Sequence, residues 1–380
     1  MLNIYMKPTN YCTVDCEHCY LPESTRADRT KMSMDTIKQT AEMVLNLAER
    51  ENHIGIHFVW HGGEPLMLQP DYFYEAGEAI ESVLGKGYFT ESLQTSMIPY
   101  TSKWAPIVKE RYASSIGTSV DFTQRKIKGN NENYLEFFLK RVEQARADGL
   151  YLTPGMVPTR HELGKGKAIV EWAIEHEFIE LNMERYSSVG STNSIDRPSN
   201  KQHSMFLIEV FDAVLSSLKT RGYAPYINTM VGAIMGIVFN NPYDRWGTKC
   251  QREFLVVEPN GSLNTCPDRA MHEKPFSNTK DGVEVFMKSE RRNWIRVMDV
   301  THKKDHCMGC ENLSWCNSGC PITPNGRSEG EDDCSGFKFF LNHVRRTLED
   351  KDNYELLLKY AEPLGDTVVA EKDIKDLFRR

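Results

Sequence analysis

Leu2-Asn-Ile-Tyr-Met6 is a predicted strand, and after a short loop it is followed by Cys12-Thr-Val-Asp-Cys16-Glu-His-Cys19. The three cysteines have the spacing C-x3-C-x2-C, and thiolates bind iron-sulfur clusters and zinc alike. Three protein ligands leave the coordination incomplete, so one iron of a four-iron cluster is free to bind a small molecule. From these residues alone, a zinc site that takes a fourth ligand such as His18 remains the alternative.

Strands and helices alternate along the first half of the chain. Apolar runs predict further strands over residues 54–60, 88–94, 115–120, 151–157 and 177–183. Helical spacing of apolar residues predicts helices over 34–50, 71–84, 101–112, 131–147 and 164–176. This alternation indicates βαβ units around a parallel sheet, and the units visible are fewer than those of a complete eight-stranded barrel.

Composition and charge describe an ordinary globular protein. Of 380 residues, 40% are hydrophobic and 26% are charged, which allows two or three domains. The net charge of -7 gives no overall reason to bind nucleic acid or an anionic membrane. The N-terminus lacks the apolar core of a signal peptide, and the apolar helix expected at 226–239 is too short to span a membrane. We therefore expect a cytoplasmic protein without nucleic-acid or membrane partners.

Ten cysteines in a reducing cytosol indicate metal or redox chemistry more than disulfides. Three of them lie at the start of the chain, and none follows until residue 250. The other seven are Cys250, Cys266, Cys307, Cys310, Cys316, Cys320 and Cys334. The segment around them has little helical or strand periodicity, so we expect bound metal to hold it together. A pair of structural zinc sites is the alternative to iron-sulfur clusters there.

The N-terminal pattern resembles the radical S-adenosylmethionine (radical SAM) superfamily. The resemblance rests on the three cysteines, on Gly62-Gly63-Glu64-Pro65 and on polar residues that end two later predicted strands. It implies a partial (β/α)6 TIM-like barrel, a [4Fe-4S] cluster on the three cysteines, and bound S-adenosyl-L-methionine that is split to a 5'-deoxyadenosyl radical. The implied cofactor contacts are Gly62, Gly63, Glu64, Thr95, Ser119 and Asp121. Glu184 and Arg185 end the sixth predicted strand and are expected to contact cofactor or substrate.

The distal cysteines resemble the SPASM domain, an auxiliary iron-sulfur extension of radical enzymes that mature peptides and proteins. Carried over by position, Cys307, Cys310, Cys316 and Cys334 hold one auxiliary [4Fe-4S] cluster. Cys250, Cys266 and Cys320 hold a second cluster near the active site, and its fourth ligand stays open because an eighth cysteine of some relatives is absent. The Asn260-Gly261 pair predicts a hairpin between Cys250 and Cys266. Asp268 follows Cys266 at a position similar to that of an active-site Asp in sulfatase-maturing relatives, which makes it a candidate base.

The resemblances give a domain plan and a working function. The barrel covers residues 1–200, a helical connector 201–245, the SPASM domain 246–336 and a C-terminal helical segment 337–380. The leading hypothesis is oxidation or cross-linking of a side chain in a ribosomally made peptide. The cysteine motif lies too near the start for an N-terminal leader-binding domain, so a separate leader-binding protein is expected, with a flavodoxin- or ferredoxin-type reductant.

Three other functions stay open at this point. The first is an anaerobic sulfatase maturase that converts Cys or Ser to formylglycine. The second is a dehydrogenase or epimerase acting on a small antibiotic precursor. The third, from a different class, is a non-catalytic iron-sulfur scaffold or electron-transfer protein, which would not cleave S-adenosylmethionine.

Overall fold

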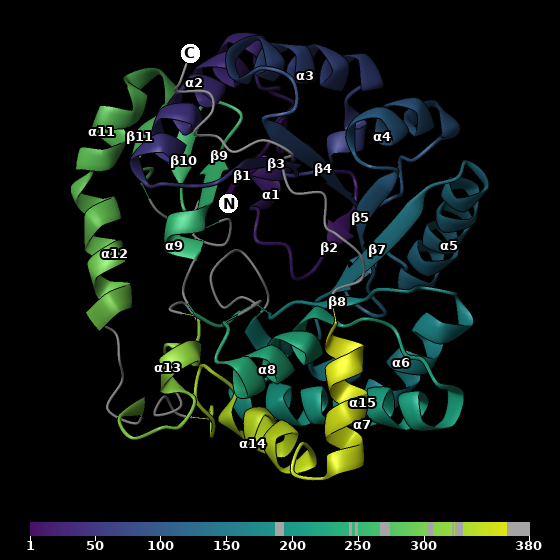
Figure 1. The fold of residues 1–380 in the computed structure, drawn as a ribbon. Coiled ribbons are helices and arrows are strands. Elements are labelled where there is room, and N and C mark those ends of the chain that lie inside the picture. Colours follow the sequence, from purple (N-terminus) through teal and green to yellow (C-terminus); the bar gives the residue numbers. More distant parts are fainter. Residues whose placement is uncertain are drawn as a thin grey trace.

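The computed structural model of the protein describes residues 1–186, 194–242, 245–247, 250–266, 274–301, 307–320, 323 and 330–362. Six parallel strands form its centre, as the alternating pattern predicts (Figure 1). They are β1 Leu2–Met6, β3 Ile56–Trp60, β4 Phe89–Thr95, β5 Ser115–Ser119, β7 Tyr151–Met156 and β8 Asn182–Met183. The helices between them are α2 Met34–Arg50, α3 Pro70–Leu84, α4 Ala105–Arg111, α5 Asn131–Ala147 and α6 Gly166–Glu175. The partial barrel is therefore confirmed.

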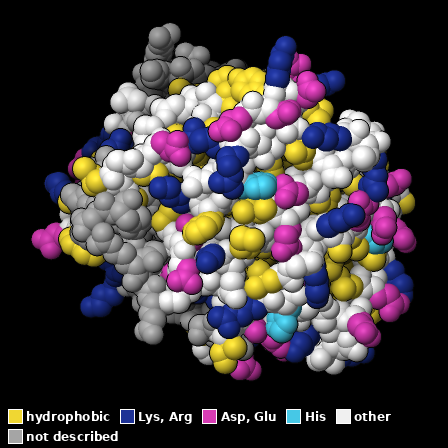
Figure 2. All heavy atoms as spheres, turned by 90° about the horizontal axis from the view of Figure 1, so that it is seen from below, with side chains coloured by type: hydrophobic (Ala, Val, Ile, Leu, Met, Phe, Trp, Pro, Cys, Tyr) yellow, Lys and Arg dark blue, Asp and Glu magenta, His cyan; other side chains and the backbone are white. Residues whose placement is uncertain are grey.

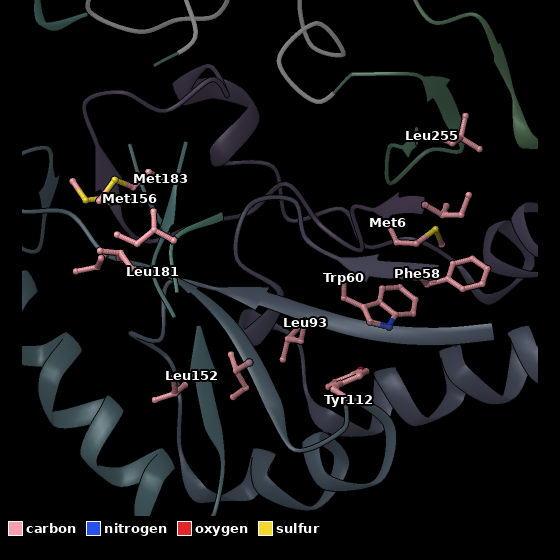
Figure 3. Close-up of a cluster of buried hydrophobic side chains, with 14 of the residues drawn as sticks. Met6, Phe58, Trp60, Leu93, Tyr112, Leu152, Met156, Leu181, Met183 and Leu255 are labelled. Carbon is pink, nitrogen blue, oxygen red and sulfur yellow. The ribbon is translucent and has the colours of Figure 1, made fainter. Parts of the chain in front are cut away.

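Burial alternates along the barrel strands. In β1, Leu2, Ile4 and Met6 are buried, whereas the residues between them are only partly buried. The same alternation runs through β3 and β4, because successive side chains of a strand point to opposite faces. Figure 3 shows Met6, Phe58, Trp60 and Leu93 in the core, beside Tyr112 from the segment after α4. The apolar face thus packs under the helices and leaves the opposite, more polar face for a site.

The sixth strand is shorter than the range 177–183 that its apolar run predicts. Glu177 has a left-handed backbone with φ +55°, and the amide of Phe178 donates to the carbonyl of Ala173. Residues 177 and 178 therefore complete the C-terminal end of α6 instead of starting a strand. Glu180 then makes a single parallel bridge to Tyr226, and only Asn182–Met183 joins the sheet, next to β7.

The C-terminal region adds three strands to the barrel sheet, and this attachment to the barrel is not predicted from the sequence. They are β9 Phe254–Val257, β10 Ser262–Asn264 and β11 Ser277–Asn278, and the full order is β11-β10-β9-β1-β3-β4-β5-β7-β8. β9 runs parallel to β1, with Asn3 beside Phe254. The expected hairpin at Asn260-Gly261 is present, and Gly261 takes the positive φ of +80° that a tight turn needs. The proposed domain limits stay predictions, but no break in the sheet separates the barrel from this hairpin.

Two groups of helices flank the sheet. α7 Asn200–Arg221, α8 Asn228–Phe239, α14 Lys338–Thr347 and α15 Lys351–Ala361 pack together in the lower half of Figure 1. α11 Gly282–Lys288 and α12 Glu290–Thr301 lie at the opposite edge, where α11 contacts α2. The shorter elements are β2 Asp15–Cys16, β6 Arg125–Lys126, α1 Glu23–Arg26, α9 Cys250–Glu253, α13 Leu313–Cys316, η1 Pro65–Met67, η2 Ser102–Trp104, η3 Arg160–Glu162, η4 Ser194–Asp196 and η5 Thr279–Asp281.

Within the described ranges, no helix combines the length and apolar character needed to cross a bilayer. Figure 2 shows the molecule from below, where Lys and Arg side chains alternate with Asp and Glu, and hydrophobic side chains form small areas between them. The coloured part of that face carries no extended area of a single charge.

Candidate functional site

A cavity of about 440 Å³ opens where the parallel strands of the barrel end. This is the edge at which α/β sheets and barrels place their ligands. The predicted residues that line it are Cys12, Cys16, Cys19, Gly62, Gly63, Thr95, Ser119, Glu184 and Arg185. Residues far apart in the sequence are thus brought to one site.

The three N-terminal cysteines lie on a loop that is held in place by backbone hydrogen bonds. Cys16 lies in β2, which pairs with β6 through Arg125, and the amide of Cys19 donates to the carbonyl of Cys16. Burial raises the pKa of Cys12 to about 12 and that of Cys16 to about 11. Thiols in this setting ionise only beside a strong positive charge, which iron would supply if it were bound here.

Cysteines can hold either a single metal ion or an iron-sulfur cluster. In the described part of the chain, no group of three His, Cys, Asp or Glu side chains is arranged around one metal ion. A zinc ion needs its sulfur ligands at about 2.3 Å from one centre. Each cysteine of an iron-sulfur cluster binds a different iron, so its ligands stand further apart. The iron-sulfur cluster that the resemblance implies on the three cysteines stays a prediction.

The glycine pair lets two loops touch at the backbone. A Cβ atom on Gly63 would lie 2.2 Å from the carbonyl oxygen of Asn10, and one on Gly62 would lie 2.6 Å from that of Thr9. Gly62 also has φ +121°, a conformation that other residues rarely adopt. The amide of Gly63 donates to the Thr9 carbonyl at 3.0 Å. Glycine is required here because any side chain would push away the segment that leads into Cys12.

Glu64 lies beneath the cavity and does not line it. Glu64 is only 1% exposed. Its carboxylate accepts hydrogen bonds from Thr95 Oγ1 at 2.6 Å and from the amide of Ser96 at 2.8 Å. A third bond, from the amide of Leu66 at 3.0 Å, caps η1. Glu64 thus ties the loop after β3 to the end of β4. Its direct contact with the cofactor stays a prediction.

Asp121 also lies outside the lining of the cavity. It is 3% exposed and accepts hydrogen bonds from the amides of Thr123 and Gln124, so it closes the turn after β5. Its Oδ2 is 3.5 Å from Nδ1 of His18, and burial raises the pKa of Asp121 to about 6. Ser119, by contrast, faces the cavity and accepts a hydrogen bond from Gln94 at 3.3 Å.

The sequence reasoning missed Arg125. This residue lines the cavity, and its Nη1 lies 3.3 Å from Sγ of Cys16. The signal in the sequence was a lone arginine just after the polar residues that end the fourth predicted strand, at 115–120. A basic residue at a strand end beside an anionic ligand set is what the chemistry of the site favours.

Arg185 links the cavity to the distal cysteines. It follows β8, faces the cavity, and its Nη2 lies 3.6 Å from Sγ of Cys320. Cys250 begins α9 and is exposed, and Cys266 follows β10. A shared cluster on Cys250, Cys266 and Cys320 stays a prediction. Asp268, the candidate base, lies outside the described residues.

The structure brings the other four distal cysteines together around a small cavity of about 30 Å³. They are Cys307, Cys310, Cys316 and Cys334, the set that the resemblance groups in one cluster. Burial raises the pKa of Cys316 to about 12 and also raises that of Cys334. A Cβ atom on Gly336 would lie 2.5 Å from Sγ of Cys316, so glycine is needed beside this site. The arrangement fits a complete four-cysteine cluster.

Comparisons with known proteins agree with this geometry. Residues 6–164 match the radical SAM superfamily. A serine-type anaerobic sulfatase-maturating enzyme of Bacteroides thetaiotaomicron is 21% identical over 90% of this chain and 89% of its own length. An uncharacterised Synechocystis protein is 22% identical over 55% of this chain, and the match spans 54% of that relative.

Solved structures extend the likeness in fold to the C-terminal region. Native anSMEcpe with bound AdoMet has a TM-score of 0.75 and 19% identity, with 95% of this chain and 99% of that one covered. Streptococcus suis SuiB bound to precursor peptide SuiA has a TM-score of 0.60 and 16% identity, with 84% and 72% covered. The chain therefore carries a radical SAM domain and has the fold of the SPASM-type maturases.

Proposed function

We propose that this chain is a radical SAM enzyme that oxidises a side chain of a ribosomally made peptide or protein. One observation carries the proposal: the cavity that holds Cys12, Cys16 and Cys19 also holds Arg185, which contacts Cys320 of the distal set. A radical source and an auxiliary cluster would then face the same substrate. That arrangement suits a net oxidation more than the simple return of a hydrogen atom.

The cofactor assignments follow from the lining of the cavity. Cys12, Cys16 and Cys19 would hold a [4Fe-4S] cluster, which with bound S-adenosylmethionine supplies a 5'-deoxyadenosyl radical. The residues proposed to hold S-adenosylmethionine are Gly62, Gly63, Thr95, Ser119, Glu184 and Arg185, with Glu64 and Asp121 fixing the strand ends beneath them. The glycines allow the backbone to approach a ligand closely.

The proposed oxidation must account for each hydrogen atom, electron and proton that leaves the substrate. A substrate that gives a hydrogen atom to the 5'-deoxyadenosyl radical must also lose one electron and one proton to reach an oxidised product. We assign the electron to the cluster on Cys250, Cys266 and Cys320, and the four-cysteine site would be a third cluster. The proton needs a base within hydrogen-bond reach, and Asp268 is our candidate. A flavodoxin- or ferredoxin-type protein would supply the electron that starts the reaction.

A peptide substrate fits the polar lining of the cavity. Tyr5, Gln94, Thr153 and Asn182 offer hydrogen-bonding groups from four different strands. An extended peptide presents backbone donors and acceptors that such groups can satisfy. The related structures support this, since anSMEcpe was solved with a bound Cp18Cys peptide and SuiB with its precursor peptide SuiA. A separate leader-binding protein is the partner that we expect for a precursor peptide.

Formylglycine formation is the second candidate. The observation that favours it is the similarity to the serine-type sulfatase-maturating enzyme, which runs over nine-tenths of both chains. Peptide cross-linking remains our leading assignment of the product. Both reactions require the same radical source and the same electron acceptor.

The first experiment tests whether the chain is a radical SAM enzyme at all. Anaerobically reconstituted protein with dithionite should convert S-adenosylmethionine to 5'-deoxyadenosine and methionine, measured by liquid chromatography. The Cys12→Ala, Cys16→Ala, Cys19→Ala triple variant should lose this activity while it keeps its auxiliary iron. A fully reconstituted wild-type protein without product would leave the scaffold function as the better assignment.

The second experiment distinguishes the products. A short peptide encoded beside this gene, and a peptide with a central Ser or Cys, would each be incubated with enzyme and analysed by tandem mass spectrometry. A cross-link gives loss of a hydrogen pair and no aldehyde, whereas formylglycine reacts with a hydrazide probe. Hydrazide labelling at Ser or Cys would replace our leading assignment with the sulfatase function.

A further inference from the structure

The hairpin of the C-terminal region reaches the segment that leads into the first cysteine motif. The amide of Lys7, directly after β1, donates to the carbonyl of Val257 at 2.9 Å. The side chains meet as well: Lys7 Nζ lies 2.6 Å from Oε1 of Glu258. Asn10 Nδ2 donates to the other carboxylate oxygen of Glu258 at 3.3 Å. One carboxylate from residue 258 therefore binds two residues of the loop before Cys12.

This contact is largely buried. Lys7 is 0% exposed and Glu258 is 7% exposed. The Lys7 ammonium also lies 5.0 Å from the centre of the Tyr20 ring, directly after Cys19. Glu258 thus meets the loop before Cys12, and through Lys7 it reaches the residue after Cys19.

The opposite side of the same loop is held by the glycine pair. The amides of Gly63 and Glu64 donate to the carbonyls of Thr9 and Tyr11 at 3.0 and 2.8 Å. Residues 7–11 are therefore clamped between the loop after β3 and the C-terminal hairpin. If the Glu258 carboxylate is removed, the hairpin keeps its backbone hydrogen bond from the Lys7 amide to Val257 but loses both side-chain contacts to this loop.

Because the ion pair is buried, it contributes more to the position of the loop than to the free energy of unfolding. Two charges taken out of water regain little net free energy, and an apolar pair of similar volume often serves stability as well. What the carboxylate adds is direction, because it fixes Lys7 and Asn10 at defined positions through two separate oxygens. A pair of this kind is expected where the placement of a loop matters.

We infer that Glu258 is a positioning residue for the first cluster and its cofactor. From the C-terminal hairpin it holds residues 7–11, and so sets where Cys12 and Cys19 stand in the cavity. The inference rests on the proposed function, in that these cysteines hold the cluster to which S-adenosylmethionine binds. It gives the C-terminal region a role in building the radical site itself, besides its role in electron transfer.

The test compares two buried carboxylates. Glu258→Gln keeps the shape and removes the charge. Glu91→Gln is the matched control, because Glu91 is also buried and paired, with Arg111 at 2.6 Å, and its carboxylate also accepts from Trp60. Each full-length variant would be reconstituted and measured for S-adenosylmethionine affinity by equilibrium dialysis, for the change that S-adenosylmethionine causes in the electron paramagnetic resonance spectrum of the reduced protein, and for thermal unfolding.

We expect both variants to unfold at a lower temperature, and only Glu258→Gln to bind S-adenosylmethionine about tenfold more weakly, with a diminished spectral change. Wild-type affinity in Glu258→Gln, or an equal loss in both variants, would overturn the inference. If Glu258→Gln does not fold, the Lys7→Met, Glu258→Met double variant replaces the ion pair by an apolar one. It should fold and still bind weakly because the bond to Asn10 is gone, and normal binding in it would refute the positioning role.

The proposed function fails in a different way. If wild-type protein with full iron neither binds nor cleaves S-adenosylmethionine, the radical SAM assignment is wrong and the comparison of variants has no signal. If the wild-type protein does both and Glu258→Gln matches it, the function stands and only the role of Glu258 is removed.

Discussion

Nη1 of Arg125 lies 3.3 Å from Sγ of Cys16, and this contact is set by the pairing of β2 with β6. The two residues lie opposite each other in a short antiparallel pair of strands. This pairing places the guanidinium of Arg125 beside the sulfur of Cys16. Burial raises the pKa of the Cys16 thiol, and the positive charge of Arg125 is the largest effect that opposes this rise. A fixed positive charge beside a cluster ligand favours the more negative, reduced form of the cluster.

Arg125→Gln should therefore lower the reduction potential of the first cluster. We expect a shift of about -60 mV, equivalent to about 1.4 kcal/mol for a one-electron couple. A mediated redox titration followed by electron paramagnetic resonance measures this, in protein in which the distal cluster ligands are replaced. Arg125→Lys keeps the charge and should stay near the wild-type potential. An unchanged potential in Arg125→Gln with full iron would refute the electrostatic role.

Glu64→Gln should weaken S-adenosylmethionine binding by about tenfold and destabilise the fold by about 2 kcal/mol. The amide of Gln would turn a donor toward Thr95 or Ser96, whose hydroxyl and amide groups are donors to Glu64 in the native protein. The end of β4 would then shift at the cavity. Equilibrium dialysis and urea unfolding measure the two effects.

Glu162→Gln is the control for that change. Glu162 is also buried, at 2% exposure, and accepts hydrogen bonds from the amide of Thr159 and from Thr123 Oγ1, both at 2.9 Å. The stability cost should be similar, but affinity for S-adenosylmethionine should stay normal. Wild-type affinity in Glu64→Gln would show that the tie between the β3 loop and β4 does not shape the site.

Much of this fold could be predicted because the barrel repeats a local pattern. The predicted strand at 2–6 and the helices at 34–50 and 131–147 agree with β1, α2 and α5 at both ends. Of the predicted strand at 177–183, only Asn182–Met183 joins the sheet, because Glu177 and Phe178 complete the end of α6 and Glu180 makes a single bridge to Tyr226. An apolar run in the sequence does not distinguish these cases. The attachment of β9 to β1 was not predictable either, since no local signal records a partner some 250 residues away.

The residues of the candidate site also fall into two groups, those that the sequence predicts and those that only the folded chain reveals. Ligand-type residues such as Cys12 and Gly62 are found from spacing, because the chemistry needs those residue types. The roles of Glu64 and Arg125 depend on distances between loops, which only the folded chain provides. Lys7 and Glu258 are the extreme case, since they lie 251 residues apart in the sequence and meet only because β9 pairs with β1.

His57→Gln should flatten the dependence of stability on pH. His57 lies on β3 with its ring nitrogens 2.7 Å from Thr90 Oγ1 and 2.9 Å from Ser92 Oγ, and burial lowers its pKa to about 4. Between pH 6.5 and 4 the unfolded chain therefore binds a proton that the folded protein does not. This contribution is constant above pH 6.5, and it is lost by about 1.4 kcal/mol per pH unit as the pH falls through that window.

Anaerobic urea unfolding of the wild type and of His57→Gln at pH 7.5, 6 and 5 tests this. Other buried histidines are common to both proteins, so the difference isolates His57. The advantage of the wild type should shrink by roughly 2 kcal/mol from pH 7.5 to 5. A constant difference across this range would mean that the ring is protonated equally in the folded and unfolded states.

Cys316→Ser should remove one complete auxiliary cluster and leave the radical source intact. Cys316 shares its small cavity with Cys307, Cys310 and Cys334, so we expect reconstituted protein to lose about four irons and four sulfides, measured chemically. Cleavage of S-adenosylmethionine to 5'-deoxyadenosine should persist because this cavity is separate from the one that contains Cys12. Cys320→Ser is the contrasting variant: Cys320 contacts Arg185 in the active cavity, so its loss should stop peptide oxidation while the iron of the four-cysteine site remains. If Cys316→Ser kept all its iron, the four-cysteine cluster would be refuted, because a buried cysteine set missing one member cannot hold a cluster as tightly as the complete set.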